Sequence, residues 1–204
     1  MAKKAESSLK NMLLSLTLIA LVASFALALV NNATKGPIED VNKKKVADAV
    51  AKVLPAFNNY TPDTVTVTMS TSKGDVDADL VRYTAYDAEG NIVGKAVESY
   101  DNNGFGGRLT AMVGFDAQGN ITGYEILGSN ETPGLGAKAS SWFQNDGKGS
   151  IIGKNPATNK VTVSKDGDGG EIDAITGSTI TSRAFCRLVG TAYNAFKVEK
   201  GETK

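Results

Sequence analysis

The sequence predicts an α+β protein in which a single amino-terminal transmembrane helix precedes a domain of antiparallel β-hairpins and flanking helices. Three observations lead to this fold class: an uncharged apolar run near the amino terminus, a repeated turn motif between strand-like segments, and an amphipathic pattern near the carboxyl terminus. The 204 residues suffice for one soluble domain plus the apolar run. We therefore expect residues 1–30 to form a cytoplasmic tail and anchor, and residues 31–204 to form one extracytoplasmic domain.

Composition narrows the chemistry that the chain can perform alone. The 22 Lys and Arg residues balance the 22 Asp and Glu residues, so the surplus of positive charge that binds nucleic acid is missing. There is no His, and Cys186 is the one Cys, which excludes an intrachain disulfide, a Cys-rich zinc site and a four-Cys iron–sulfur cluster. We expect no catalytic or metal site, so any redox or group-transfer chemistry must come from an organic cofactor.

The apolar run from residue 11 to residue 30 predicts a membrane anchor. Nineteen helical residues, 12–30, at about 1.5 Å each span roughly 28 Å, close to the hydrocarbon thickness of a bilayer. Lys3, Lys4 and Lys10 precede the run, and Asn31 and Asn32 directly follow it, which predicts a single-pass inner-membrane protein with a cytoplasmic amino terminus and a periplasmic domain. A cleaved signal peptide is the alternative, because residues 26–28 read Ala-Leu-Ala, although the apolar run continues beyond them.

A second helix and a strand are expected after the anchor. Apolar residues recur at helical spacing between Pro37, which suits a first helical turn, and Pro55, which ends the pattern. Residues 64–70 (TVTVTMS) alternate β-branched and polar side chains and predict a strand. The apolar positions of the helix are Ile38, Val41, Val46, Ala49, Val50, Val53 and Leu54.

An internal repeat predicts two hairpins. Residues 87–94 (DAEGNIVG) recur as residues 116–123 (DAQGNITG), and each copy is flanked by strand-like runs. Asp and Gly in a short loop supply a side-chain-capped turn and a residue that tolerates positive φ, so we interpret both copies as turns of one antiparallel meander. A calcium loop does not fit, because the acidic residues lack the spacing of a ligand set. The run 166–170 (DGDGG) is interpreted as another turn, with a cation site as the less favoured alternative.

The carboxyl-terminal region predicts a third helix over residues 182–197. One stripe of this segment is apolar, and Cys186 lies beside that stripe, so we expect the thiol to pack in the core. The stripe consists of Phe185, Leu188, Val189, Ala192 and Phe196.

Two short motifs are the candidates for function. Residues 131–136 (ETPGLG) place two glycines around a turn, which leaves backbone N–H groups open to an anion or a planar ring. Residues 173–182 (DAITGSTITS) place five hydroxyls just before the last helix, where a helix start favours a phosphate. Each motif also has a structural interpretation, as an ordinary tight loop and as a cluster of helix-capping residues.

Together the two motifs resemble the FMN-binding domain of the G subunit of the Rnf electron-transport complex, which is homologous to the C subunit of the sodium-pumping NADH:quinone reductase. The resemblance extends over nearly the whole chain and implies covalent FMN, joined by a phosphoester bond to the last Thr of an Asp-x-x-(Ser/Thr)-Gly-Ala-Thr motif. That residue is Thr179 here, while Ser178 replaces the usual Ala, and Ser129 stands where many relatives have a His. The implied cofactor-binding residues are Thr179, Ser178, Gly177, Thr176, Asp173, Glu131, Thr132, Leu135 and Gly136.

The resemblance also implies a function and partners. The chain would be an electron-transfer subunit of an ion-translocating ferredoxin:NAD oxidoreductase, without an active site of its own. Its partners would be other membrane subunits of the complex, membrane lipid, and a flavin transferase that uses FAD and magnesium to attach FMN. Two alternatives stay open from the sequence: a membrane-tethered binding module without a redox cofactor, and a stand-alone extracellular flavoprotein that carries electrons.

Overall fold

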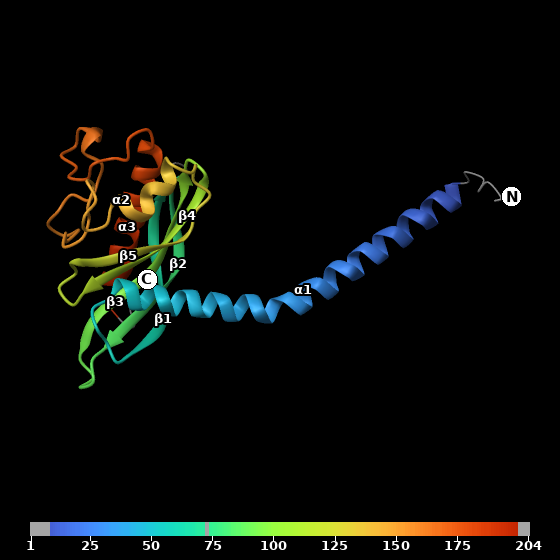
Figure 1. Cartoon of the computed structure of the whole chain (residues 1–204), viewed down its shortest axis with the longest axis horizontal. Coiled ribbons are helices and arrows are strands. Elements are labelled where there is room, and N and C mark those ends of the chain that lie inside the picture. Colours follow the sequence, from blue (N-terminus) through green and yellow to red (C-terminus); the bar gives the residue numbers. More distant parts are fainter. Residues whose placement is uncertain (1–8, 72–73, 200–204) are drawn as a thin grey trace. The chain divides into compact units, whose positions relative to one another are not determined.

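The computed structural model describes residues 9–71 and 74–199 and divides the chain into two units, residues 1–45 and 46–204 (Figure 1). The domain boundary that we predict after residue 30 falls inside the first helix and stays a prediction. The elements in chain order are α1 (Leu9–Val53), β1 (Asn59–Thr71), β2 (Gly74–Tyr86), β3 (Ile92–Gly104), β4 (Gly107–Asp116), β5 (Ile121–Gly128), η1 (Gly136–Lys138), α2 (Ala139–Trp142), η2 (Ser164–Asp166) and α3 (Thr179–Lys197).

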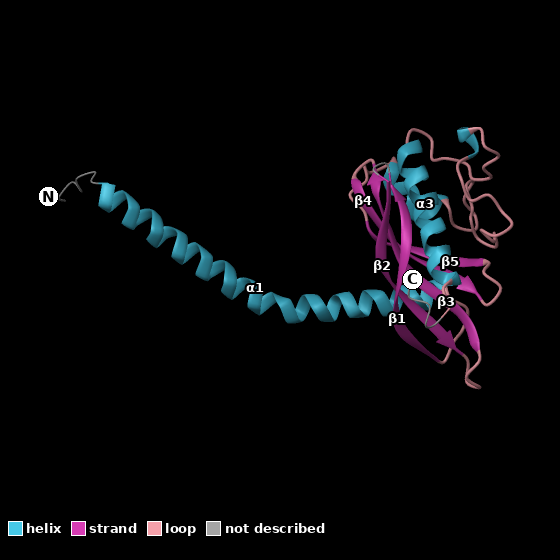
Figure 2. Ribbon diagram, turned by 180° about the vertical axis from the view of Figure 1, so that it is seen from behind, coloured by secondary structure: helices cyan, strands magenta, loops and turns pink. Residues whose placement is uncertain are grey.

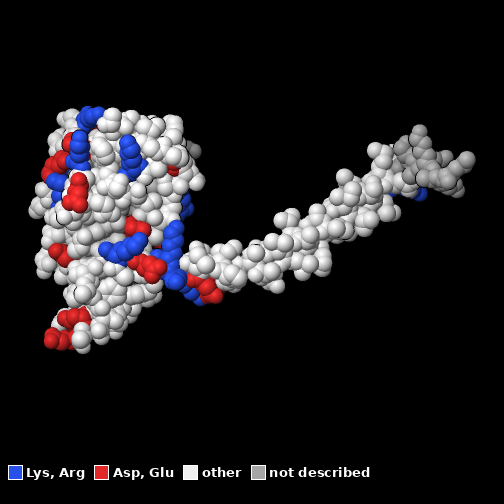
Figure 3. All heavy atoms as spheres, in the orientation of Figure 1, with Lys and Arg blue, Asp and Glu red and all other residues white. Residues whose placement is uncertain are grey.

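Helix α1 contains the predicted membrane span. It has 45 residues, and its apolar stretch is long enough to cross a bilayer while none of that stretch is buried inside the protein. Figure 3 shows a long part of α1 without charged side chains, as expected for a surface that contacts hydrocarbon. The structure therefore agrees with the anchor that the sequence predicts.

The separate second helix is a wrong prediction, because α1 runs without interruption through Pro37. Proline removes one backbone hydrogen bond and crowds the preceding turn, but a helix with many turns on either side absorbs that loss. The apolar pattern after Pro37 is only half buried. Residues 49, 50, 53 and 54 lie in the core, whereas Ile38 and Val41 are exposed.

The five strands form one antiparallel sheet in the order β1-β2-β3-β4-β5, which confirms the predicted meander. The repeated motif makes the β2–β3 and β4–β5 turns in the same way. Asp87 Oδ1 accepts the N–H groups of residues 89 and 91 at 2.9 and 2.8 Å, and Asp116 Oδ1 repeats this with residues 118 and 120. Gly90 and Gly119 have φ of +86° and +87°, a conformation that favours glycine.

The sheet is covered on both faces. Strand side chains alternate, so Val97 packs with α3 on one face, while its neighbour Ala96 packs with residues 49–54 on the other. Helix α3 lies across the sheet (Figure 2), and its predicted stripe is buried except for Phe196, which is partly buried. Cys186 is buried as predicted, and burial raises the pKa of its thiol to about 12.

Arg82 fastens the end of α3 to the sheet. Its guanidinium, on β2, is buried and binds both carboxylate oxygens of Asp63 on β1, at 3.2 and 2.6 Å. The same side chain donates to the carbonyl oxygens of Ala195 and Val198, at 2.9 and 2.5 Å. A cation at a helix carboxyl terminus satisfies carbonyl groups that have no partner within the helix. Arg82 therefore joins β1, β2 and α3 through one group.

We expect Arg82→Met to lower the free energy of unfolding by about 3–5 kcal/mol, because it leaves the Asp63 carboxylate and two carbonyl groups without their donor. Urea denaturation of the chain in detergent, followed by tryptophan fluorescence, measures this loss. The control is Arg183→Met, which removes a largely exposed ion pair with Asp166 and should cost at most about 1 kcal/mol. Equal losses for the two variants would contradict the role of Arg82.

Candidate functional site

The two motifs that the sequence separates by about forty residues meet at one cavity. Its volume is about 370 Å³, within the usual range for small-molecule sites. One wall is the loop before η1, and the other is the start of α3. The residues that line the cavity are Phe105, Glu131, Thr132, Leu135, Gly136, Gly177, Ser178, Thr179 and Ile180.

Glu131 holds the two walls together. Its side chain is buried, and Oε2 accepts a hydrogen bond from the Thr181 hydroxyl of α3 at 2.8 Å. Its other oxygen, Oε1, accepts the Gly106 N–H from the β3–β4 turn at 3.1 Å. The backbone N–H of Glu131 donates in turn to the hydroxyl of Ser129 at 3.2 Å. A buried carboxylate needs such donors, so Glu131 fixes three segments in one arrangement.

Gly136 is required by close packing against this carboxylate. A Cβ at position 136 would overlap Glu131 Oε2 and lie 2.8 Å from Thr181 Oγ1. Our interpretation of this glycine as a place of backbone approach to a ligand therefore changes: its missing side chain makes room for Glu131.

The loop is also less open than the sequence suggests. The carbonyl oxygen of Thr132 accepts the N–H groups of Leu135 and Ala137 at 3.1 and 3.2 Å, so these two donors are used inside the loop. The prediction of several free N–H groups in residues 131–136 is therefore wrong for Leu135, and Ala137 directly follows the motif. What the loop presents to the cavity includes the Leu135 side chain, which is 44% exposed.

The start of α3 distinguishes the three threonines of the second motif. Thr179 is the first residue of the helix, is partly buried and lines the cavity. Thr181 is fully buried and its hydroxyl is bonded to Glu131. Thr176 is exposed and does not line the cavity. Among the three, only Thr179 combines a cavity position with a hydroxyl that is not committed to Glu131.

The helix start itself is built by backbone and serine groups. Ser178 occupies the N-cap position, and its side chain forms no capping hydrogen bond. The Ser182 hydroxyl donates to the Ser178 carbonyl at 2.9 Å and accepts the Ile175 N–H at 2.9 Å, which closes the preceding turn. Without a side-chain cap, the first N–H groups of α3 remain available to an anion.

Asp173 lies outside the cavity. Its carboxylate accepts from the Ser164 hydroxyl at 3.2 Å, and its carbonyl accepts from the Trp142 indole at 2.8 Å. Asp173 and Thr176 are thus the two sequence-predicted residues that the structure does not bring to the cavity wall. Asp173 instead connects α2 and η2 to the segment that leads into α3.

The structure adds two cavity residues that sequence reasoning missed, Phe105 and Ile180. They are 70% and 50% exposed, so together with Leu135 they form an apolar rim. Phe105 belongs to a β3–β4 turn, far from both motifs in sequence. A large aromatic side chain between glycines, in residues 104–107, was the available signal.

Electrostatically, the cavity is almost neutral. Glu131 is the one ionisable residue in its lining, and within residues 9–71 and 74–199 no cluster of His, Cys, Asp and Glu side chains has metal-binding geometry. The apolar rim and the uncapped start of α3 therefore suit an organic group with an apolar ring and an anionic end.

The DGDGG run forms the predicted turn. Its Asp166 pairs with Arg183, whose Nε lies 2.8 Å away, and this hydrogen bond lowers the pKa of Asp166.

Comparison with known proteins gives concordant matches. A profile of the FMN-binding domain family matches residues 104–194. The G subunit of the Na(+)-translocating ferredoxin:NAD(+) oxidoreductase complex of Acetobacterium woodii is 37% identical, over 90% of this chain and 89% of that protein. The G subunit of the ion-translocating oxidoreductase complex of Cereibacter sphaeroides is 34% identical, over 88% and 79%. The crystal structure of Shewanella oneidensis NqrC has 20% identity and a TM-score of 0.42, over 64% and 63% of the two chains.

We expect Gly136→Ala to destabilise the domain by about 1–3 kcal/mol, because the added methyl group collides with the Glu131 carboxylate and the Thr181 hydroxyl. Thermal or urea unfolding measures the change. The control is Gly190→Ala within α3, where nothing lies within 4 Å of the added carbon, and helix propensity predicts a gain of up to about 1 kcal/mol. If Gly136→Ala were as stable as the unaltered chain, the packing of Glu131 against this glycine would be disproved.

Proposed function

The chain belongs to the family of G subunits of ion-translocating oxidoreductase complexes, and we infer that it serves such a complex as an electron-carrying flavoprotein anchored in the membrane. The observation that carries this inference is the convergence of both motifs on one cavity inside the region that matches the FMN-binding domain family. By analogy with the Acetobacterium woodii relative, the reaction of the complex is electron transfer between ferredoxin and NAD coupled to ion movement.

The residues of the cavity fit FMN, and we call it the FMN cavity. The apolar rim of Phe105, Leu135 and Ile180 suits a flat ring system, and the uncapped start of α3 suits a phosphate. When bound, flavin supplies one- and two-electron transfer that no side chain of this protein offers. The protein's part would be to position the group: Glu131 fixes the two walls, and the rim offers apolar surface to the ring.

We assign the attachment to Thr179, through a phosphoester bond between its hydroxyl and the FMN phosphate. Local structure supports this choice over the neighbouring threonines. Thr181 is buried and bonded to Glu131, and Thr176 is exposed away from the cavity. A phosphate on Thr179 would lie at the helix start, where N–H groups and the helix dipole favour negative charge.

Maturation and topology complete the proposal. A flavin transferase that uses FAD and magnesium installs FMN on Thr179, and Ser178 in place of the usual Ala is accommodated as the N-cap residue. The lysines before the span favour an amino terminus in the cytoplasm, and we propose that residues 31–204 lie on the periplasmic side of the inner membrane. Covalent attachment suits an exported domain, because free FMN lost there would diffuse away. Electrons then pass to or from neighbouring membrane subunits.

Thr179→Ala should abolish flavin fluorescence of the chain on a denaturing gel after co-expression with a flavin transferase. The fold should survive at a cost below about 1 kcal/mol, because Ser178 and not Thr179 holds the N-cap position. Thr176→Ala is the matched control and should stay fluorescent, while Thr179→Ser should keep part of the label because it retains a hydroxyl. Full fluorescence in Thr179→Ala, or peptide mapping of FMN to Thr176 or Thr181, would refute the assignment.

The proposed topology predicts that protease added to cells with a permeabilised outer membrane digests the domain. The reason is the lysine-rich amino-terminal flank, which is retained on the cytoplasmic side. An immunoblot against the carboxyl-terminal residues follows the digestion, with a cytoplasmic protein as the control for intact inner membranes. Protection of the domain until the cells are lysed would reverse the orientation.

A further inference from the structure

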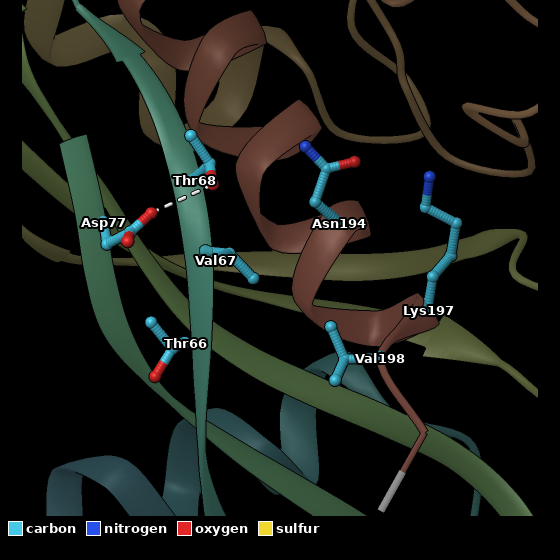
Figure 4. A pocket seen from close by; sticks show the side chains of 7 residues that line it. All are labelled: Thr66, Val67, Thr68, Asp77, Asn194, Lys197 and Val198. Atoms are coloured by element: carbon cyan, nitrogen blue, oxygen red, sulfur yellow. Dashed lines mark hydrogen bonds between the residues drawn. The ribbon is translucent and has the colours of Figure 1, made fainter. Parts of the chain in front are cut away.

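A second cavity follows the outer edge of the sheet at β1. Its volume is about 500 Å³, and its walls come from β1, from Asp77 on β2 and from the end of α3 (Figure 4). Thr66 and Thr68 point to one face of β1 and Val67 to the other, yet all three line the cavity. Since β2 occupies one edge of β1, a groove that touches both faces lies along the free edge. We call it the β1 groove; the remaining lining residues are Asp77, Asn194, Lys197 and Val198.

The two edges of the sheet are treated differently. On β5, the carboxyl-terminal edge, Ile121 exchanges backbone hydrogen bonds with residues 153 and 154 at 2.8 and 2.9 Å, and the Gln144 side chain donates to the Tyr124 carbonyl at 3.0 Å. Strand β1 has 13 residues, with Pro62 and Asp63 near its start, but from residue 64 to residue 70 it carries no charge, proline or bulge. Natural sheets usually protect a long edge with such features. The stretch from residue 64 to residue 70 is therefore suited to receive another strand.

The helix wall of the β1 groove carries a positive charge, Lys197, and a side-chain amide, Asn194. Asn194 and Lys197 extend from α3 in the same direction (Figure 4), and both are exposed. The Lys197 ammonium lies 5.1 Å from the ring centroid of Tyr193, and none of the ion pairs within the described residues includes it. On the opposite face of the hairpin, Asp77 and Asp79 are exposed and hold the hydroxyls of β1 threonines.

We propose that the β1 groove binds an extended segment of another subunit of the complex, which adds to the sheet as a sixth strand. Backbone groups of β1 supply the hydrogen bonds, and side chains of the added strand alternate between the two faces. The face toward α3 selects an acidic side chain near Lys197, and the face that carries Asp77 selects a basic one. This inference rests on the proposed function, which provides a multi-subunit complex.

A second copy of this chain is a poorer occupant. The edge it would offer is its own β1, and residues 64–69 contain no acidic side chain to face Lys197. Self-association through β1 would also leave the Asp77 and Asp79 carboxylates without a basic partner on the added strand. The charges of the groove thus favour a partner strand of different sequence.

Photo-cross-linking in the assembled complex tests this proposal. A photoreactive amino acid replaces Asn194 in the full chain, which is expressed with the other subunits and with the flavin transferase. After irradiation and purification of the complex, mass spectrometry identifies the cross-linked peptide. We expect a segment of another subunit that has an acidic residue within a few positions of the cross-link. A cross-link to a second copy, to residues 200–204 of the same chain, or to no other subunit would overturn the proposal.

A charge reversal gives an independent measurement. Lys197→Glu should weaken retention of the chain in the purified complex by about tenfold, as expected for replacing an attractive charge pair across the interface by a repulsive one. Lys148→Glu makes the same charge change on an exposed loop that does not line the β1 groove, and should be retained normally. Equal retention of the two variants would also overturn the proposal.

Flavin fluorescence separates this outcome from failure of the proposed function. Both variants should keep covalent flavin, since neither residue lines the FMN cavity. If the unaltered chain lacked flavin or did not purify with other membrane subunits, the proposed function would fail first. If it did both and gave none of the expected cross-links, only the β1 groove proposal would fail.

Discussion

The buried carboxylate of Glu131 is the interaction on which the arrangement of the site depends. It takes one hydrogen bond from the β3–β4 turn and one from the first turn of α3, so a loop, a hairpin and a helix meet at a single charged group. The bond to Thr181 orients the start of α3, with Thr179 lining the cavity. Gly136 follows from the same constraint, because no other residue leaves room for the carboxylate.

Helix α3 is held at both ends by groups of opposite charge. Glu131 binds its first turn, and Arg82 binds the carbonyl groups of its last turn. Between these ends, the apolar stripe packs on the sheet, and the Ser99 hydroxyl donates to the Leu188 carbonyl at 3.0 Å. A helix fixed in this way cannot slide along the sheet without breaking buried hydrogen bonds. A cofactor attached at its start, as we propose, would therefore keep a defined position relative to a neighbouring subunit that exchanges electrons with it.

The two edges of the sheet have different roles. The segment between β5 and α3 forms backbone hydrogen bonds with the β5 edge. The same segment also supports the FMN cavity, through the bond between Trp142 and Asp173. The β1 edge remains open beside the last turn of α3, at the opposite end of that helix from Thr179. Cofactor binding and strand addition would thus use separate surfaces of one rigid unit, as suits a subunit that must assemble and carry electrons at once.

The sequence by itself determined the features that depend on local physics. The uncharged run indicated the anchor, the Asp-Gly repeat indicated two hairpin turns, and the stripe around Leu188 indicated the last helix, because each pattern acts through residues close in the chain. The two motifs also pointed to the cavity, although their meeting was an implication of family resemblance. The continuous helix through Pro37 escaped prediction, because a proline that suits a helix start is also tolerated inside a long helix.

Only the tertiary structure decided which of these residues act together. The family motif selects Thr179, and the structure separates it from its neighbours: Glu131, fifty positions before Thr181, binds the Thr181 hydroxyl, and Thr176 does not line the cavity. Phe105 lines the cavity and Asp173 does not, because the positions of both residues depend on how a turn and a loop pack against α3. Close packing and the pairing of buried polar groups involve segments that are distant in the sequence, so they cannot be predicted from a local pattern of residues.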